Sequence, residues 1–191
     1  MTTLFTHRLE LVPITLPMVE AVMAGDRAAA EAHAKARLPE AWPGRELIER
    51  AFTVSMSAIR ENPDKRLWGD RLMISRESGE RVVLGSVVFH GFPDDGIADI
   101  GYGVERAYQG RGYATEATRA CVQWAMSQQG IRGIRATTFA WNRPSLRVIA
   151  KLGMRPAGTR DHELLGELLD FELRHERDVF NVARDFVASH T

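Results

Sequence analysis

Hydrophobic and polar positions in the first half of the chain alternate at two spacings, which predict strands and helices. The segment "RLELVPIT" alternates as a strand does and ends at Pro13. Two regions with helical spacing follow at about residues 15–37 and 44–61, and "ENPDK" closes them. Residues 67–76 and 81–92 then have strand character on either side of "ESGE", a loop that contains glycine. We therefore expect a hairpin after a helical region.

The second half of the chain alternates strands with helices. The expected order is a strand at 97–104, a helix to about Gln128, a strand in "IRGIRATTFAW", a short helix in "NRPSLRVIAKLG", strands at about 155–162 and 168–176, and a terminal helix at 178–190. Asn142 suits the N-cap of the short helix, and Gly153 suits its end. This order is typical of a mixed α/β sheet. We expect a single domain over residues 1–191, with a variable helical region at 14–61 and the core sheet at 67–176.

Charge and composition exclude several classes of protein. Lys and Arg total 25 and Asp and Glu also total 25, so the formal net charge is zero. A general nucleic-acid-binding protein needs a basic surface, which this balance does not supply. The chain has no run of about 20 apolar residues that could span a membrane. Its N-terminal segment lacks the basic and apolar parts of a secretory leader. We therefore expect a cytoplasmic protein without nucleic-acid or membrane partners.

Cysteine and histidine give no sign of a disulfide or a metal site. Cys121 is the one cysteine of the chain and falls within an apolar helical run, so we expect a small buried side chain rather than a nucleophile. The histidines at positions 7, 33, 90 and 175 show no ligand spacing with cysteine or carboxylate. We expect no bound metal.

The stretch "YQGRGYATEA" places Gly110-Arg111-Gly112 directly before a predicted helix. The first amides of a helix have no partner within the helix, and its dipole leaves that end partly positive. Glycines let a loop approach a phosphate closely, so the pattern fits an anion site, although a plain turn has the same sequence. No Walker A string is present, and Thr115 stands where a dinucleotide fingerprint needs its third glycine. Both common nucleotide-binding interpretations therefore fail.

The pattern Gln109-Gly110-Arg111-Gly112-Tyr113-Ala114 resembles the Gln/Arg-x-x-Gly-x-Gly/Ala motif of the GCN5-related N-acetyltransferase (GNAT) superfamily. "IADIGYGV" resembles the strand that precedes this motif, and "TEATRACVQWAM" resembles the helix that follows. "ATTFAWNRPSLRVIAKLGM" resembles the next strand, the Asn-x-x-Ser turn and the last helix of the core. The resemblance is strong over residues 97–158 and weaker over 67–96. Glu116-Ala117 after the loop and the Asn-x-x-Ser turn resemble the branch of the ribosomal-protein-alanine N-acetyltransferases.

This resemblance implies a fold, a co-substrate and the residues that bind it. The implied fold is a mixed, mostly antiparallel central sheet flanked by helices. The implied co-substrate is acetyl-CoA, with its pantetheine arm along the edge of the strand around Tyr102 and Val104. The residues that would bind the pyrophosphate through backbone amides are Gln109, Gly110, Arg111, Gly112, Tyr113, Ala114 and Thr115. Asn142 and Ser145 of the Asn-x-x-Ser turn would complete the acetyl-CoA site.

The resemblance also suggests the catalytic residues. Many members of the family use a tyrosine of the last helix to donate to the departing sulfur, and Ile149 stands in that position here. The ribosomal-protein branch is thought to use the serine of Asn-x-x-Ser, which is Ser145. The expected base is a carboxylate on the strand after that helix, and Glu163 lies nearest, with Asp161, His162 and Asp99 as alternatives.

The predicted activity is transfer of an acetyl group from acetyl-CoA to a primary amine, by direct attack in a ternary complex. The acceptor stays open between a protein N-terminal amine, a polyamine, an amino acid and an antibiotic, because the helices at 14–61 would form its site. The isoleucine in the tyrosine position supports an alternative, an acyl-CoA-binding regulatory or interaction module without turnover. A homodimer is common in this family.

Overall fold

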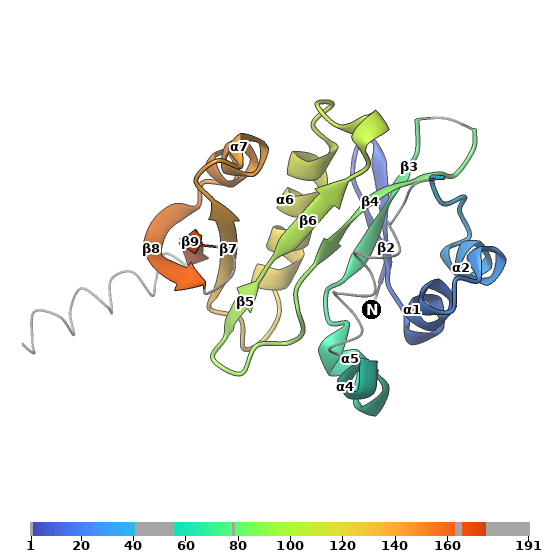
Figure 1. Ribbon diagram of the computed structural model, residues 1–191, viewed down its shortest axis with the longest axis horizontal. Coiled ribbons are helices and arrows are strands. Elements are labelled where there is room, and N and C mark those ends of the chain that lie inside the picture. Colours follow the sequence, from blue (N-terminus) through green and yellow to red (C-terminus); the bar gives the residue numbers. More distant parts are fainter. Residues whose placement is uncertain (1, 41–55, 78, 163–165, 175–191) are drawn as a thin grey trace, which may run out of the picture. The chain divides into compact units, whose positions relative to one another are not determined.

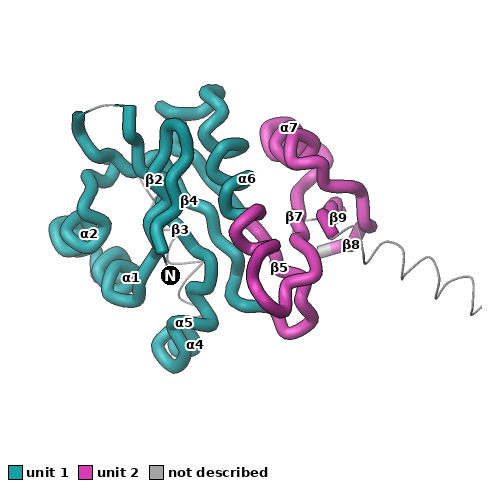
Figure 2. The backbone as a smooth tube through the Cα atoms, turned by 180° about the vertical axis from the view of Figure 1, so that it is seen from behind, with its two compact units in different colours: residues 1–92, 101–121 teal, residues 93–100, 122–191 magenta. Residues whose placement is uncertain are grey.

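The computed structural model describes residues 2–40, 56–77, 79–162 and 166–174. The chain divides into two compact units, one formed by residues 1–92 and 101–121, the other by residues 93–100 and 122–191 (Figure 2). The start of the expected helix at 44–61, the proposed base Glu163 and the expected helix at 178–190 lie outside the described residues. Each unit is described by itself below.

The first unit contains a five-stranded antiparallel sheet and several helices (Figure 1). The strands lie in the order β1-β2-β3-β4-β6, with bounds Leu4–Phe5, Leu9–Pro13, Arg71–Ser75, Val83–Val88 and Gly101–Val104. The helices are α1 (Leu16–Met23), α2 (Arg27–Ala34), α4 (Met56–Glu61), α5 (Pro63–Arg66), the 3-10 turn η1 (Arg106–Tyr108), and the first part of α6 (Tyr113–Met126). The predicted hairpin is thereby confirmed as β3 and β4.

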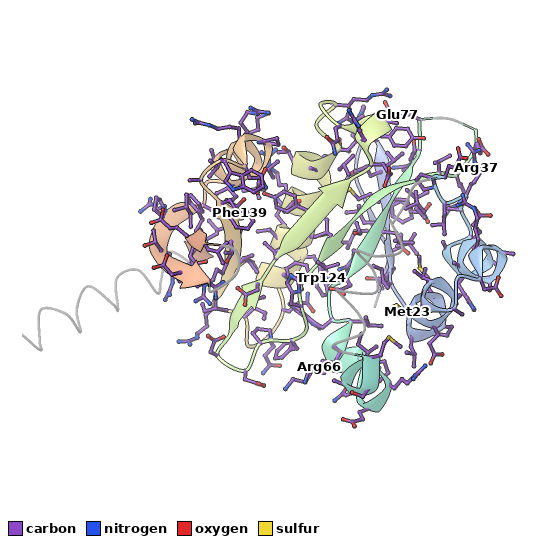
Figure 3. All side chains as sticks on the ribbon, in the orientation of Figure 1. Met23, Arg37, Arg66, Glu77, Trp124 and Phe139 are labelled. Carbon is purple, nitrogen blue, oxygen red and sulfur yellow. The ribbon has the colours of Figure 1, made fainter. Side chains whose placement is uncertain are left out.

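The core of this unit forms where α1, α2 and α4 cover the sheet. Leu72, Ile74 and Val83 contribute fully buried side chains from the strands, and Met23 of α1 packs against the same cluster (Figure 3). Burying a side chain of this size contributes about 1.5–3 kcal/mol relative to leaving it in water. β3 is buried along nearly its whole length, and three of its four buried residues, Leu72, Met73 and Ile74, are apolar.

The predicted single helical region at 15–37 is two helices in the structure. Gly25 has a φ of +71°, which ends α1, and the carboxylate of Asp26 then accepts from the backbone N–H of Ala29 at 2.9 Å. That contact caps the N-terminus of α2. Similarly, Asn62 caps the short helix α5 by accepting from Lys65 N at 3.0 Å, where only a closing turn was expected. This helix explains why β3 begins at Arg71 rather than at residue 67.

The predicted strand at 97–104 changes its partner halfway along. Residues Ile97–Asp99, labelled β5, run parallel to β7 in the second unit, whereas Gly101–Val104, labelled β6, run antiparallel to β4 in the first. Between them, Ile100 donates its backbone N–H to the carbonyl of Arg135 at 2.8 Å. Each half is therefore the edge strand of a different sheet.

Gly85 makes the pairing of β6 with β4 possible. Met73 pairs with Gly85 and Ile74 with Val83, so β4 carries one extra residue at a bulge there. Gly85 has a φ of +157°, and a Cβ at this position would lie 2.0 Å from the carbonyl oxygen of Gly103. Only glycine therefore fits between the two strands.

The second unit contains a four-stranded mixed sheet in the order β5-β7-β9-β8. The further bounds are β7 (Gly133–Phe139), β8 (Arg155–His162), β9 (Gly166–Arg174) and helix α7 (Arg143–Lys151). The structure confirms both predicted ends of α7: Asn142 Oδ1 accepts from Ser145 N at 3.3 Å, and Gly153 has a φ of +75° just after the helix. Together the two units confirm the predicted mixed α/β, mostly antiparallel sheet structure flanked by helices.

Cys121 of α6 is fully buried, as predicted. Burial raises the pKa of its thiol to about 12, which leaves it protonated and unreactive at neutral pH. Within the part of the chain that the structure describes, no helix has the length and apolar character needed to cross a membrane.

Candidate functional site

The loop between η1 and α6 exposes a row of backbone N–H groups. Gly110 and Gly112 have φ values of +76° and +86°, a conformation that residues other than glycine rarely adopt. Among the described residues, none accepts a hydrogen bond from the backbone N–H groups of residues 110–115. Successive amides of this kind, next to the partly positive end of a helix, form an anion-binding concavity. The geometry therefore favours the anion site over a plain turn.

Both side chains and backbone groups hold this loop in place. Gln109 Nε2 donates to the carbonyl of Val104 at 2.8 Å, which ties the loop to the end of β6. Arg111 Nη2 donates to the carbonyl of Ala107 at 3.2 Å. At the helix start, Glu116 N donates to the carbonyl of Gly112 at 3.1 Å. Gln109, which we expected among the cofactor-binding residues, thus helps to shape the loop.

The loop lies beside residues of the N-terminal segment that sequence reasoning missed. Arg8 forms an ion pair with Glu116 and also donates to the carbonyl of Arg111. A cavity of about 490 Å³ is lined by Arg8, Glu77, Tyr108, Arg111 and Tyr113, together with apolar residues of the β3–β4 hairpin. Figure 3 shows Glu77 at that hairpin, where its carboxylate accepts a hydrogen bond from the hydroxyl of Tyr113. More than 100 residues of chain separate Arg8 from the loop, so no local pattern could reveal their contact.

Tyr102 and Val104 lie on β6, the edge strand of the five-stranded sheet. They pair with Val87 and Gly85 of β4 on one side. An edge strand presents backbone N–H and C=O groups along its other side, where an amide-bearing ligand can bind. The strand ends at the loop, because Glu105 N donates to the carbonyl of Leu84 at 2.8 Å and η1 follows. The structure therefore brings the two expected pantetheine-binding residues into the same unit as the loop.

Asn142, Ser145 and Ile149 belong to the second unit. The Asn142 side chain caps α7 as described, and Ser145 in the first turn is half-buried. The side chain of Ile149 is 1% exposed, so this position is part of the core. At the position where the resemblance suggested a catalytic tyrosine in other members, this chain thus has an apolar core residue.

Asp99 and Asp161, two of the three alternative base residues, differ in their surroundings. Asp99, half-exposed, lies 3.9 Å from Arg135 Nη1. Asp161 is exposed on β8, opposite Glu167 of β9. The side chain of His162, the third alternative, lies outside the described residues. Over the described residues, no group of three or more His, Cys, Asp or Glu side chains could hold a metal ion.

Comparison with known proteins gives a consistent picture. The model of the acetyltransferase (GNAT) domain matches residues 8–155. The uncharacterized N-acetyltransferase YjdG of Bacillus subtilis is 26% identical over 154 residues, which cover 80% of this chain and 89% of YjdG.

Solved structures are similar over nearly the whole chain. The ribosomal-protein-S5-alanine acetyltransferase of Vibrio fischeri has a TM-score of 0.62 at 15% identity, covering 92% of this chain and 98% of that one. RimJ of Mycobacterium smegmatis, solved with a CoA disulfide, has a TM-score of 0.58 at 20% identity. The match covers 88% of this chain and 83% of that one. At these identities the likeness shows the fold.

Proposed function

Because this chain belongs to the acetyltransferase (GNAT) family and is an acetyl-CoA-dependent N-acetyltransferase, we propose that a primary amine attacks the thioester directly within a ternary complex. The observation that carries this proposal is the loop at residues 109–115. Its consecutive backbone N–H groups have no acceptor in the described part of the chain and lead into the N-terminus of helix α6. A pyrophosphate supplies several acceptor oxygens and negative charge to such a site.

In this proposal each part of the first unit binds one part of acetyl-CoA. The amides from Gln109 to Thr115 bind the pyrophosphate, and the guanidinium of Arg111 adds positive charge beside them. The edge of β6 around Tyr102 and Val104 pairs with the amides of the pantetheine arm, as a peptide pairs with an open sheet edge. The conformations of Gly110 and Gly112 support this assignment, because each lets the backbone approach an anion where a side chain would intervene.

The proposed chemistry needs a base and a hydrogen-bond donor. Glu163 takes one proton from the attacking amine as the N–C bond forms to the acetyl carbonyl. The C–S bond breaks, and the hydroxyl of Ser145 donates to the departing thiolate of CoA. Ile149 has no group that could do this, which supports Ser145 as the donor. Asn142 fixes the first turn of α7 by capping it, and thereby holds the backbone of Ser145.

The acceptor class is a primary amine, and four kinds remain in the proposal: a protein N-terminus, a polyamine, an amino acid and an antibiotic. The α-amine of a protein N-terminus is the first to test, because the Vibrio fischeri neighbour is named as an acetyltransferase for the alanine of a ribosomal protein. A peptide that begins with alanine or serine is the simplest probe of this class.

Release of the CoA thiol from acetyl-CoA is the measurement that tests the proposed function. We expect release only with an amine present, and a matrix of both substrate concentrations should give intersecting reciprocal plots, as a ternary complex requires. Parallel plots would indicate an acetylated enzyme instead. Binding of acetyl-CoA without release over the whole amine panel would favour the non-catalytic acyl-CoA-binding module.

A further inference from the structure

Three donors from the segment Thr6–Arg8 surround the carboxylate of Glu116 in the first turn of α6. Thr6 Oγ1 and the backbone N–H of Arg8 donate to Oε1 at 2.6 and 2.8 Å, and Arg8 Nε donates to Oε2 at 2.8 Å. Burial raises the pKa of Glu116, but these hydrogen bonds outweigh that effect and hold the pKa below its usual value. Glu116 is therefore a charged residue that binds the segment Thr6–Arg8 close to the loop.

The same arginine also fixes one peptide of the loop. Arg8 Nη1 donates to the carbonyl oxygen of Arg111 at 2.9 Å. The peptide between Arg111 and Gly112 is trans, so its C=O and N–H point in opposite directions. Holding the carbonyl of Arg111 toward Arg8 therefore turns the N–H of Gly112 away from Arg8. That N–H is one of the groups without an acceptor in the described residues.

Arg8 is itself held on the sheet and against the first residue of α6. Its carbonyl accepts from Arg76 N at 2.9 Å, beside the end of β3. Its guanidinium carbon lies 4.5 Å from the ring centre of Tyr113, within the range of a cation–π contact. The Tyr113 side chain is 6% exposed. Arg8 thus joins the sheet, the loop and the helix start through a side chain with little freedom to move.

From these contacts we propose that Arg8 and Glu116 are positioning residues for acetyl-CoA, which set the loop in its ligand-binding conformation without touching the ligand. This inference rests on the proposed function. Preorganisation of a binding loop raises affinity because less freedom is lost on binding. The segment Thr6–Arg8, which precedes the first long strand, is accordingly part of the acetyl-CoA binding apparatus.

The charge of Glu116 makes the proposal sharply testable. A carboxylate near a phosphate site repels the ligand, so if charge alone mattered, Glu116→Gln would strengthen CoA binding. If Glu116 acts by holding Arg8, the same substitution weakens CoA binding, because Arg8 loses its ionic partner. The two explanations therefore predict opposite changes in CoA affinity for Glu116→Gln.

The experiment compares CoA affinity and steady-state kinetics across four proteins. Wild type, Arg8→Ala and Glu116→Gln are titrated with CoA by calorimetry, with Arg81→Ala as the matched control. Arg81 also pairs with a glutamate, Glu10 of β2, and donates to a backbone carbonyl, that of Lys35, at 2.8 Å. Among the contacts that the described residues make, Arg81 has none of this kind with the loop at residues 109–115.

We expect the Kd for CoA to rise about 10-fold or more in Arg8→Ala, which corresponds to loss of a charge-assisted hydrogen bond. Glu116→Gln should weaken binding in the same direction. The KM for acetyl-CoA should rise in parallel while kcat at saturation stays near that of wild type, and Arg81→Ala should leave both constants unchanged.

Unchanged or tighter CoA binding in Glu116→Gln would overturn the inference, and so would an equal loss of affinity in Arg81→Ala. If Arg8→Ala does not fold, the sign of the Glu116→Gln effect still decides. Failure of wild type itself to bind CoA would refute the proposed function first. If wild type binds CoA and turns over, and the variants bind CoA as wild type does, only the positioning role is refuted.

Discussion

Gly85 offers the most direct test of the fold around the site. Replacing it with alanine would place a Cβ 2.0 Å from the carbonyl oxygen of Gly103 and 2.9 Å from the Cα of Val104. Both contacts are to backbone atoms of β6, so no side-chain rotation can relieve them. The strands must separate or the bulge must rearrange.

Two effects add in this variant. The φ of +157° at Gly85 is a conformation that L residues rarely adopt, and such strain costs about 1–3 kcal/mol. Inserting a methyl group into a packed position costs about 1–3 kcal/mol more. We therefore expect Gly85→Ala to lower the free energy of unfolding by about 2–6 kcal/mol, a large part of the ~5–15 kcal/mol of an ordinary domain.

Urea denaturation measures the free energy of unfolding of each variant. A separate titration of the folded protein measures its Kd for CoA. Gly79→Ala is the matched control, because its Cβ would have no atom within 4 Å. CoA affinity should fall with stability in Gly85→Ala, since β6 leads directly into the loop. A Gly85→Ala protein as stable as Gly79→Ala, to within about 0.5 kcal/mol, would refute this account of the β4–β6 pair.

Four further predictions concern single residues. Gly112→Asp should abolish detectable CoA binding in calorimetry, because it adds bulk and negative charge where the φ is +86°. If binding becomes measurable only at high salt, the negative charge is the main cause of the loss. Ser145→Ala should leave the Kd for CoA unchanged and slow transfer about 10- to 100-fold, and unchanged turnover would remove Ser145 from the mechanism. Asp70 is buried, and burial raises its pKa to about 7, so the folded state should lose stability as the pH rises from about 4 to 7; Asp70→Asn should flatten that dependence in denaturation curves. Cys121 should resist alkylation in the folded protein. In urea it should take up one alkyl group, which mass spectrometry would detect.

The parts of the site that depend on local sequence could be predicted. Gly110 and Gly112 before a helical run, and Asn142 three residues before Ser145, are signals within a single turn of chain. The structure places glycines at positive φ in the first case and a capped helix in the second. The break between α1 and α2 had a local signal too, because Gly25-Asp26 is a helix stop followed by an N-cap residue.

Other parts depend on contacts between distant segments and left no local trace. A strand pattern shows which residues alternate, not which partner each half takes, so the change of sheet at Ile100 could not be read from "IADIGYGV". In the same way, Arg8 looks like any surface arginine in the sequence. Its proposed role depends on Glu116 and Arg111, which become its neighbours only in the folded unit.

The division of the strand at Ile100 has a consequence for how this protein can be cut or recombined. The chain passes between the two units after residues 92, 100 and 121. A break after residue 121 keeps the first unit whole but removes β5 from the four-stranded sheet, and any earlier break that spares β5 takes β6 and the loop from the five-stranded one. No single junction leaves both units complete. Neither unit is therefore a cassette that evolution or an engineer can exchange by one crossover while the other stays intact.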